Sequence, residues 1–237
     1  MLSVVLPCYN EKDNLEALFN RLDLLAENSE SIEIILVNNG STDGSDMVFE
    51  TELAKRDTSI FKVVKVEKNI GYGFGILSGL RAAKGEVLSV THADRQTDPM
   101  DVLKAHNIYL SASDPNLLVK GFRKNRKLSE AVFSYGMGLL ASIVLGTRLT
   151  EVNAQPKLFS QSFFNRFEKH APHDFSLDLY LLFQAKKHGS IKDFPVYFAK
   201  RVAGEAKGGS GSSFKTRWKL IKRSFNYIFE LKKQVIS

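Results

Sequence analysis

The sequence predicts an α/β protein: a mostly parallel, doubly wound sheet flanked by helices, with a basic amphipathic helix at the C-terminal end. Strand and helix signals alternate through the first half of the chain, which is typical of a parallel sheet built from strand–helix units. Polar or glycine-rich segments follow the first, second and fourth expected strands. Ligands bind at such strand ends in open α/β sheets, so the same pattern places a candidate site.

The elements follow from periodicity. Short apolar runs such as Ile32–Val37 indicate buried strands, and apolar residues three and four positions apart, as from Leu15 to Leu25, indicate helices. The expected strands cover 3–7, 32–37, 62–66, 87–90, 117–123 and 191–198, and the expected helices cover 14–26, 45–56, 71–83, 129–145, 176–188 and 214–235. No internal repeat is evident.

Composition bounds the possibilities. The 237 residues are 43% apolar, enough for one or at most two domains with a real core. A single cysteine, Cys8, excludes an internal disulfide and fits a reducing compartment. The first residues are too short and uncharged a stretch for a secretory signal, and no apolar run reaches the roughly 20 residues of a membrane span. We therefore expect a cytoplasmic protein.

The basic charge is concentrated near the C-terminal end. Ten Lys and Arg but only two Glu lie between Lys200 and Ser237, whereas the whole chain has a net charge of +7. We expect one domain over 1–203, followed over 204–237 by a Gly/Ser-rich loop and the basic helix. Such a helix either packs on the domain or lies on an anionic membrane surface, here the inner face of the membrane. Nucleic acid is disfavoured, because the cations follow one helix and no stacked aromatic surface accompanies them.

The segment Thr91–Pro99 holds the clearest candidate chemistry. It follows the apolar strand at 87–90 and contains His92, Asp94 and Gln96 at alternate positions. Alternate side chains of an extended segment point to one side, so these three are expected to converge on one divalent cation. Because histidine is a softer ligand than carboxylate, His92 favours Mn²⁺ over Mg²⁺; alternatively, it hydrogen-bonds ribose or phosphate.

These segments together resemble a known family. Val5–Glu11, Val37–Gly44, Asn69–Gly79, Ala82–Glu86 and His92–Gln96 stand in the order and spacing of the inverting family-2 glycosyltransferases with the GT-A fold. The segments Gly121–Arg123, Pro195–Arg201 and Gly204–Lys207 are similar to the branch that makes dolichyl- or polyprenyl-phosphate sugars. The chain departs from the family at His92, where the first acid of an Asp-x-Asp motif is usual, and at Asn39, where a carboxylate is usual.

The resemblance implies a site for a nucleotide-diphosphate sugar, a divalent metal (Mn²⁺ or Mg²⁺) and a lipid-phosphate or glycan acceptor. Donor-binding residues carried over from it are Pro7, Tyr9, Asn10, Glu11, Asn38, Asn39, Gly71, His92, Ala93, Asp94, Arg123, Arg201 and Lys207. The metal ligands would be Asp94, His92 and Gln96, and the acceptor side would include Gln155, Lys157 and Asp178. The catalytic residues would be Asp178, Asp94, Arg201 and Lys207.

Each assignment has a structural alternative. Asn38 and Asn39 can simply begin a turn, and Asp178, or Asp174 as second choice for a base, can simply interact with a helix dipole.

A lipid phosphate acceptor is already ionised and needs no base, whereas a hydroxyl acceptor does. We expect transfer of sugar to polyprenyl phosphate. The alternatives are transfer to a sugar hydroxyl in surface-polysaccharide assembly and an inactive nucleotide-binding module. A sugar nucleotidyltransferase is disfavoured, because no Gly-rich basic loop follows the first strand. A homodimer is possible.

Overall fold

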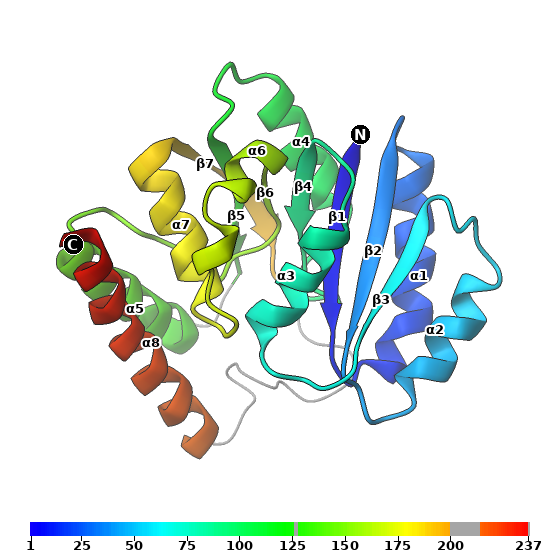
Figure 1. The fold of residues 1–237 in the computed structure, drawn as a ribbon, viewed down its shortest axis with the longest axis horizontal. Coiled ribbons are helices and arrows are strands. Elements are labelled where there is room, and N and C mark those ends of the chain that lie inside the picture. The colour runs from blue at the N-terminus through cyan, green and yellow to red at the C-terminus, as the bar shows by residue number, and fades with distance from the viewer. Residues whose placement is uncertain (126–127, 200–213, 237) are drawn as a thin grey trace.

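A computed structural model describes residues 1–125, 128–199 and 214–236 of the chain. Its centre is a seven-stranded sheet in the order β3-β2-β1-β4-β6-β5-β7 (Figure 1). The strands are β1 (Leu2–Cys8), β2 (Ile32–Asn39), β3 (Phe61–Val66), β4 (Val87–Val90), β5 (Leu117–Lys124), β6 (Lys157–Ser160) and β7 (Ser190–Tyr197). Neighbouring strands pair in parallel, except that β6 runs antiparallel to both β4 and β5.

Helices cover both faces of this sheet. One face packs against α1 (Lys12–Glu27), α2 (Ser45–Leu53) and α4 (Asp101–Leu110). The other packs against α3 (Tyr72–Ala82), α5 (Leu128–Leu145), α6 (Gln161–Asn165), α7 (Leu177–His188) and α8 (Phe214–Ile236), with a short 3-10 turn, η1 (Glu168–His170). The α/β class and mostly parallel sheet predicted from the sequence are therefore confirmed.

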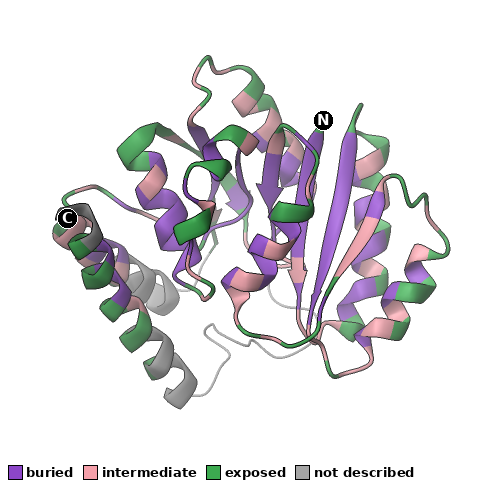
Figure 2. Ribbon diagram, viewed as in Figure 1, coloured by how far each residue is buried: buried purple, intermediate pink, exposed green. Residues whose placement is uncertain are grey.

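The core explains why the strands form where they do. All eight residues of β2 are buried, as are six of the seven in β1, so both read as largely apolar runs in the sequence, with Ser3 and Glu33 as buried polar exceptions (Figure 2). Such runs are typical of parallel strands with helices on both faces. Alternate residues feed the two cores: Val4 and Leu6 face α1, whereas Val5 faces α3.

Four elements were not predicted, namely α4, β6, α6 and η1, and α2 ends at Leu53 rather than near residue 56. The strand β6 matters most for the site, because it inserts between β4 and β5 and carries Lys157 into the middle of the sheet. The proposed division at residue 203 falls outside the described residues.

The helices α5 and α8 lie side by side at one end of the molecule (Figure 1). In α8, Tyr227, Ile228 and Leu231 are buried, so this helix packs on its neighbours along one face. In the part of the chain that the structure covers, no helix combines the length and the apolar character needed to cross a membrane.

Candidate functional site

The candidate site lies where the strand order reverses. The strand β1 sits between β2 and β4, and the chain leaves the carboxyl ends of all three at the same edge of the sheet. This is the position at which open α/β sheets bind ligands. It brings together the segments after β1, β2 and β4 that the sequence singled out.

The loops after β1 and β2 are tied to one another. The Asn10 backbone N–H donates to Ser41 Oγ at 3.1 Å, and Thr42 N–H donates to Asn10 Oδ1 at 2.8 Å. Asn10 has a positive φ of 55°, which its short polar side chain tolerates better than most. Glu11 accepts from Asn14 Nδ2 at 2.6 Å. Pro7 and Tyr9 are half-buried at the same mouth.

The two asparagines that end β2 have different roles. The Asn38 amide donates to Asp46 at 2.5 Å and accepts from the Ser41 N–H at 3.1 Å, so it fits the interpretation of a turn-forming residue. The Asn39 amide donates to the Gly71 carbonyl at 3.1 Å. Its Oδ1 is buried and makes no hydrogen bond within the described residues, so this oxygen remains free to accept one.

Glycines bring the start of α3 close to this amide. A Cβ at Gly75 would lie 2.8 Å from Asn39 Cγ, and one at Gly71 would lie 2.1 Å from the His173 carbonyl oxygen. Gly71 also has a φ of 148°, which L side chains rarely adopt. The glycines at the start of α3 therefore permit close approach by the Asn39 side chain and by the segment that precedes α7.

The segment after β4 is not extended, contrary to the expectation. Residues 93–97 form a series of bends, and Arg95 adopts a left-handed φ of 59°. Asp94 Oδ1 accepts from the Gln96 N–H at 3.1 Å, and the Gln96 side-chain amide donates to the Ala199 carbonyl at 3.3 Å. The alternation argument for three converging ligands therefore fails, because the segment bends at Arg95 and does not run extended. Ala93 points into the core.

His92 and Asp94 nevertheless lie close enough to interact electrostatically. Burial lowers the pKa of His92, and the negative charge of Asp94 opposes that effect. A neutral imidazole is the form that binds metals. Within the described residues, no group of three His, Cys, Asp or Glu could hold a metal ion. Asp94 and His92 would supply one carboxylate and one imidazole to a divalent ion, which suits an ion that takes its other ligands from outside the protein.

Behind these residues lies a buried polar cluster built from β6, its preceding segment and α7. Lys157 Nζ contacts Asp178 Oδ1 at 2.6 Å, and both side chains are at most 4% exposed. The Lys157 ammonium also donates to the Ala154 carbonyl at 3.0 Å, and Gln155 Nε2 donates to Asp178 at 3.1 Å. Burial lowers the pKa of Lys157, and the Asp178 charge opposes that effect.

Tyr72 joins this cluster to the donor side, which the sequence did not indicate. Its hydroxyl is buried, and burial together with the negative charges of Asp178 and Asp94 raises its pKa. Its ring stacks on Phe175, with centroids 4.8 Å apart and planes within 8°. A side-chain hydrogen bond between Tyr72 and Gln155 opposes this rise in pKa, so the two side chains act as one polar unit beside Asp178.

Of the three predicted phosphate-binding cations, the structure describes only Arg123. Arg123 Nε donates to Glu151 at 2.7 Å, and its guanidinium lies 5.4 Å from the Phe198 ring centroid. One of its terminal nitrogens, Nη2, is buried with no hydrogen bond among the described residues. Arg201 and Lys207 lie outside the described residues. Asp174, the second choice for a base, accepts from the Ser176 N–H at 2.8 Å and from Arg223 of α8.

The fold and these motifs match known proteins. Residues 3–132 match the family model described as Glycosyl transferase family 2. The chain belongs to this family. It is 30% identical over 128 residues to an undecaprenyl-phosphate 4-deoxy-4-formamido-L-arabinose transferase of Aeromonas hydrophila, covering 54% of this chain and 38% of the relative. It is 27% identical over 165 residues to a dodecaprenyl-phosphate galacturonate synthase of Rhizobium johnstonii, covering 68% and 48%.

The chain thus spans less than half the length of these two relatives. Among solved structures, glucosyl-3-phosphoglycerate synthase of Mycobacterium tuberculosis, in a complex with Mn²⁺, UDP and glucosyl-3-phosphoglycerate, superimposes with a TM-score of 0.65 at 20% identity. That match covers 86% of this chain and 72% of the synthase chain. At this identity the likeness concerns the fold, and it confirms the GT-A architecture.

Proposed function

We propose that this protein is an inverting glycosyltransferase that moves a sugar from a nucleotide-diphosphate sugar to the phosphate of a polyprenyl phosphate. The observation that carries the proposal is the convergence of the β1, β2 and β4 strand ends on one edge of a family-2 domain. The names of the relatives support the acceptor class, since both act with polyprenyl phosphates.

The donor would lie across the strand ends. The free Asn39 Oδ1 is a buried acceptor suited to a base or ribose donor group, and it keeps that contact without a negative charge. Arg123 has a buried terminal nitrogen available for a phosphate oxygen. Arg201 and Lys207 remain predicted phosphate-binding cations. Pro7, Tyr9 and Glu11 would line the nucleotide pocket.

A divalent ion, Mn²⁺ or Mg²⁺, would be held by Asp94 and His92 together with the donor diphosphate. When bound, it would supply positive charge that stabilises the departing nucleoside diphosphate. Gln96 stays a predicted third ligand through its side-chain carbonyl oxygen, because the bond to Ala199 uses only the side-chain nitrogen.

The state of Asp178 favours a phosphate acceptor over a hydroxyl acceptor. A general base must accept a proton, yet protonating Asp178 would leave the buried Lys157 ammonium without its anionic partner. Asp178 is therefore committed to Lys157 and Gln155, which makes it a poor candidate for a base. An ionised phosphate oxygen attacks the anomeric carbon without losing a proton, so this cluster can position the acceptor and needs no proton transfer.

The α5–α8 end of the molecule would contact the membrane. Trp218, Phe225 and Phe229 are 60%, 43% and 40% exposed and share one face of α8, opposite its buried face. On α5, Leu139 and Ile143 are 48% and 70% exposed. The exposed cations Lys222, Lys232 and Lys233 accompany the aromatic residues. Aromatic and basic side chains on an amphipathic helix suit attachment to an anionic surface, and we place the protein at the inner membrane face.

The decisive experiment measures transfer of radiolabelled sugar from UDP- and GDP-sugars to a short polyprenyl phosphate, with Mn²⁺, with Mg²⁺ and with a chelator. We expect one donor to support metal-dependent transfer. Asp94→Ala should lower that transfer by a hundredfold or more, on the order of an effect of several kcal/mol on the transition state. Asp13→Ala, an exposed carboxylate on α1, is the matched control.

Other outcomes separate the alternatives. Transfer to a sugar hydroxyl but not to lipid phosphate would favour a role in glycan assembly. Nucleotide-dependent thermal stabilisation without transfer or donor hydrolysis would favour the inactive binding module. Full activity of Asp94→Ala would remove Asp94 from the proposed metal site.

A further inference from the structure

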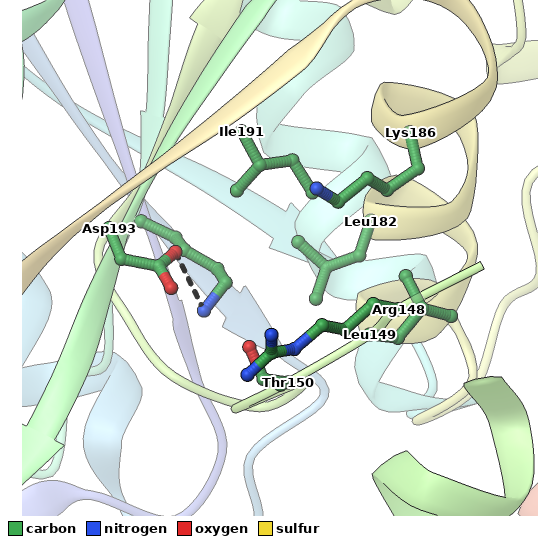
Figure 3. A pocket seen from close by; sticks show the side chains of 8 residues that line it. Arg148, Leu149, Thr150, Leu182, Lys186, Ile191 and Asp193 are labelled. Atoms are coloured by element: carbon green, nitrogen blue, oxygen red, sulfur yellow. Dashed lines mark ion pairs between the residues drawn. The ribbon is translucent and has the colours of Figure 1, made fainter.

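A pocket outside the donor site carries an excess of positive charge. It lies between β5, β7, α7 and the segment that follows α5, and its volume is about 190 Å³. Figure 3 shows its lining, which comprises Lys120, Arg148, Leu149, Thr150, Leu182, Lys186, Ile191 and Asp193. Three of these side chains are cations and one is a carboxylate. Asp94, His92 and Arg123 do not line it.

The central cation is almost completely buried. The Lys120 side chain is 2% exposed, and its Nζ lies 3.0 Å from Asp193 Oδ1, the ion pair drawn in Figure 3. Asp193 is the one acceptor that the described residues give this ammonium. An ammonium has three donors, so at least two remain for another acceptor. A buried cation whose donors are only partly used is costly, which favours a bound partner.

The other two cations are available. Arg148 and Lys186 are exposed at the pocket rim, and across the described ranges neither forms an ion pair. Thr150 adds a hydroxyl to the lining. Guanidinium, ammonium and hydroxyl donors around one space are the groups that bind phosphate oxygens. The pocket volume is several times the roughly 30 Å³ that one water occupies in the liquid, so a phosphate group can enter.

A second buried ammonium adds to the charge excess. Lys120 and Lys157 are directly paired across β5 and β6, and each carries its ammonium into the same interior. Their mutual repulsion is one of the effects that lower the pKa of Lys157. Each lysine has one carboxylate partner, Asp193 or Asp178, and Asp193 is 39% exposed, so it is a weaker counter-charge.

We propose that this pocket is a second oxyanion site, which binds a phosphate group between Lys120, Arg148, Lys186 and Thr150. The chemistry is that of a phosphate monoester or inorganic phosphate. The group would come either from a lipid headgroup, since Arg148 follows α5 at the end we assign to the membrane, or from free phosphate in solution. The site is separate from the donor site and would bind its ligand whether or not the protein transfers sugar.

The test is binding of inorganic phosphate, and of a water-soluble alkyl phosphate, to the full chain by isothermal titration calorimetry. Chloride at matched ionic strength serves as the reference. Arg148→Gln and Lys186→Gln should each weaken binding about tenfold, the loss expected for one charge-assisted contact. Lys187→Gln removes the neighbouring exposed cation outside the lining and should leave binding unchanged. Asp94→Ala should also leave it unchanged, which separates this site from the donor site.

To test a lipid headgroup as the source of the phosphate, binding to phosphatidylcholine vesicles is measured with and without phosphatidic acid. If the source is a headgroup, the alkyl phosphate binds at least as well as phosphate, and Arg148→Gln lowers attachment to phosphatidic-acid vesicles more than Lys187→Gln does. If the source is free phosphate, inorganic phosphate binds better and the two variants attach equally. The proposal is overturned if neither phosphate binds, or if Arg148→Gln and Lys186→Gln bind phosphate as tightly as the unaltered chain.

Discussion

Breaking the buried Lys157–Asp178 pair should cost far more stability than breaking a surface pair. At 2.6 Å and an effective dielectric constant of about 20, the attraction between the two charges is about 6 kcal/mol. Removing both charges from water offsets much of this attraction, so the net value of the pair is smaller. Removing one partner alone leaves a buried charge without compensation. We therefore expect Asp178→Asn and Lys157→Met each to lower the free energy of unfolding by about 3–5 kcal/mol.

The double variant isolates the interaction. Lys157→Met combined with Asp178→Asn removes both charges, so its cost should be at least 2 kcal/mol less than the sum of the single variants. Equilibrium unfolding in urea at pH 7, followed by circular dichroism, gives the three free energies. Glu168→Gln is the matched control, because Arg81 and Glu168 form a 3.3 Å pair with side chains 44% and 27% exposed. It should lose less than about 1 kcal/mol.

The same variants test the chemistry assigned to Asp178. A general base contributes a factor of about 10²–10⁴ to the rate, whereas a carboxylate that only balances Lys157 contributes much less. Folded Asp178→Asn should therefore retain transfer to a phosphate acceptor within about tenfold. Strict additivity of the two single losses, or a folded Asp178→Asn that has lost transfer by more than a hundredfold, would refute this reasoning.

The remaining predictions concern the outer face of α8 and a buried carboxylate in the sheet. Replacing Trp218 and Phe225 by serine should weaken binding to anionic vesicles about a hundredfold in a sedimentation assay. Leu110→Ser, which alters an exposed leucine of α4, is the control. Equal binding by the unaltered chain, the double variant and the control would contradict the membrane assignment. Burial opposes ionisation of Glu33. Hydrogen bonds from the Lys62 and Ser3 side chains and from the Lys84 backbone outweigh this effect and lower the pKa of Glu33 below its ordinary 4.5. The stabilisation that ionised Glu33 gives the fold is thus complete above pH 4.5 and disappears as the pH falls through the lower folded-state pKa. Glu33→Gln should therefore lower the free energy of unfolding by about 2 kcal/mol at pH 7, and by progressively less when urea unfolding is repeated at decreasing pH. A cost independent of pH would contradict this account.

Local sequence patterns were sufficient to predict most strands of the sheet. The strands β1 and β2 are buried on both faces, so their apolar runs are unambiguous. The strand β6 is different. It has four residues, the first of which is the charged Lys157, and its partners β4 and β5 lie far away in the sequence. A lysine at the start of a short apolar run reads as a surface residue, and only the tertiary pairing with Asp178 makes its burial possible.

At the candidate site, too, contacts between distant segments could not be predicted from local patterns. The segment after β4 was predicted to matter, and it does lie at the strand-end edge, but its left-handed bend at Arg95 could not be read from side-chain alternation. Lys120 was missed because a lysine in a strand carries no local sign of its counter-charge. Asp193, its partner, is seventy-three positions away in the sequence but directly paired with it across β5 and β7. Local patterns locate strand ends, whereas the contacts that decide ionisation are made between strands.

The C-terminal helix shows how such contacts decide between two interpretations. Apolar residues at three- and four-residue spacing from 214 to 228 predicted a single stripe, and a single stripe is satisfied by packing on the domain. In the structure this set divides: Ile228 is 1% exposed against the core, whereas Trp218 and Phe225 are 60% and 43% exposed. With Phe229, 5.0 Å from Phe225 between ring centroids, they form a second apolar face that folding of the domain does not require. A helix that packs on the domain by one face and presents aromatic and basic side chains on another can do both at once, so domain packing and membrane attachment are not alternatives for α8.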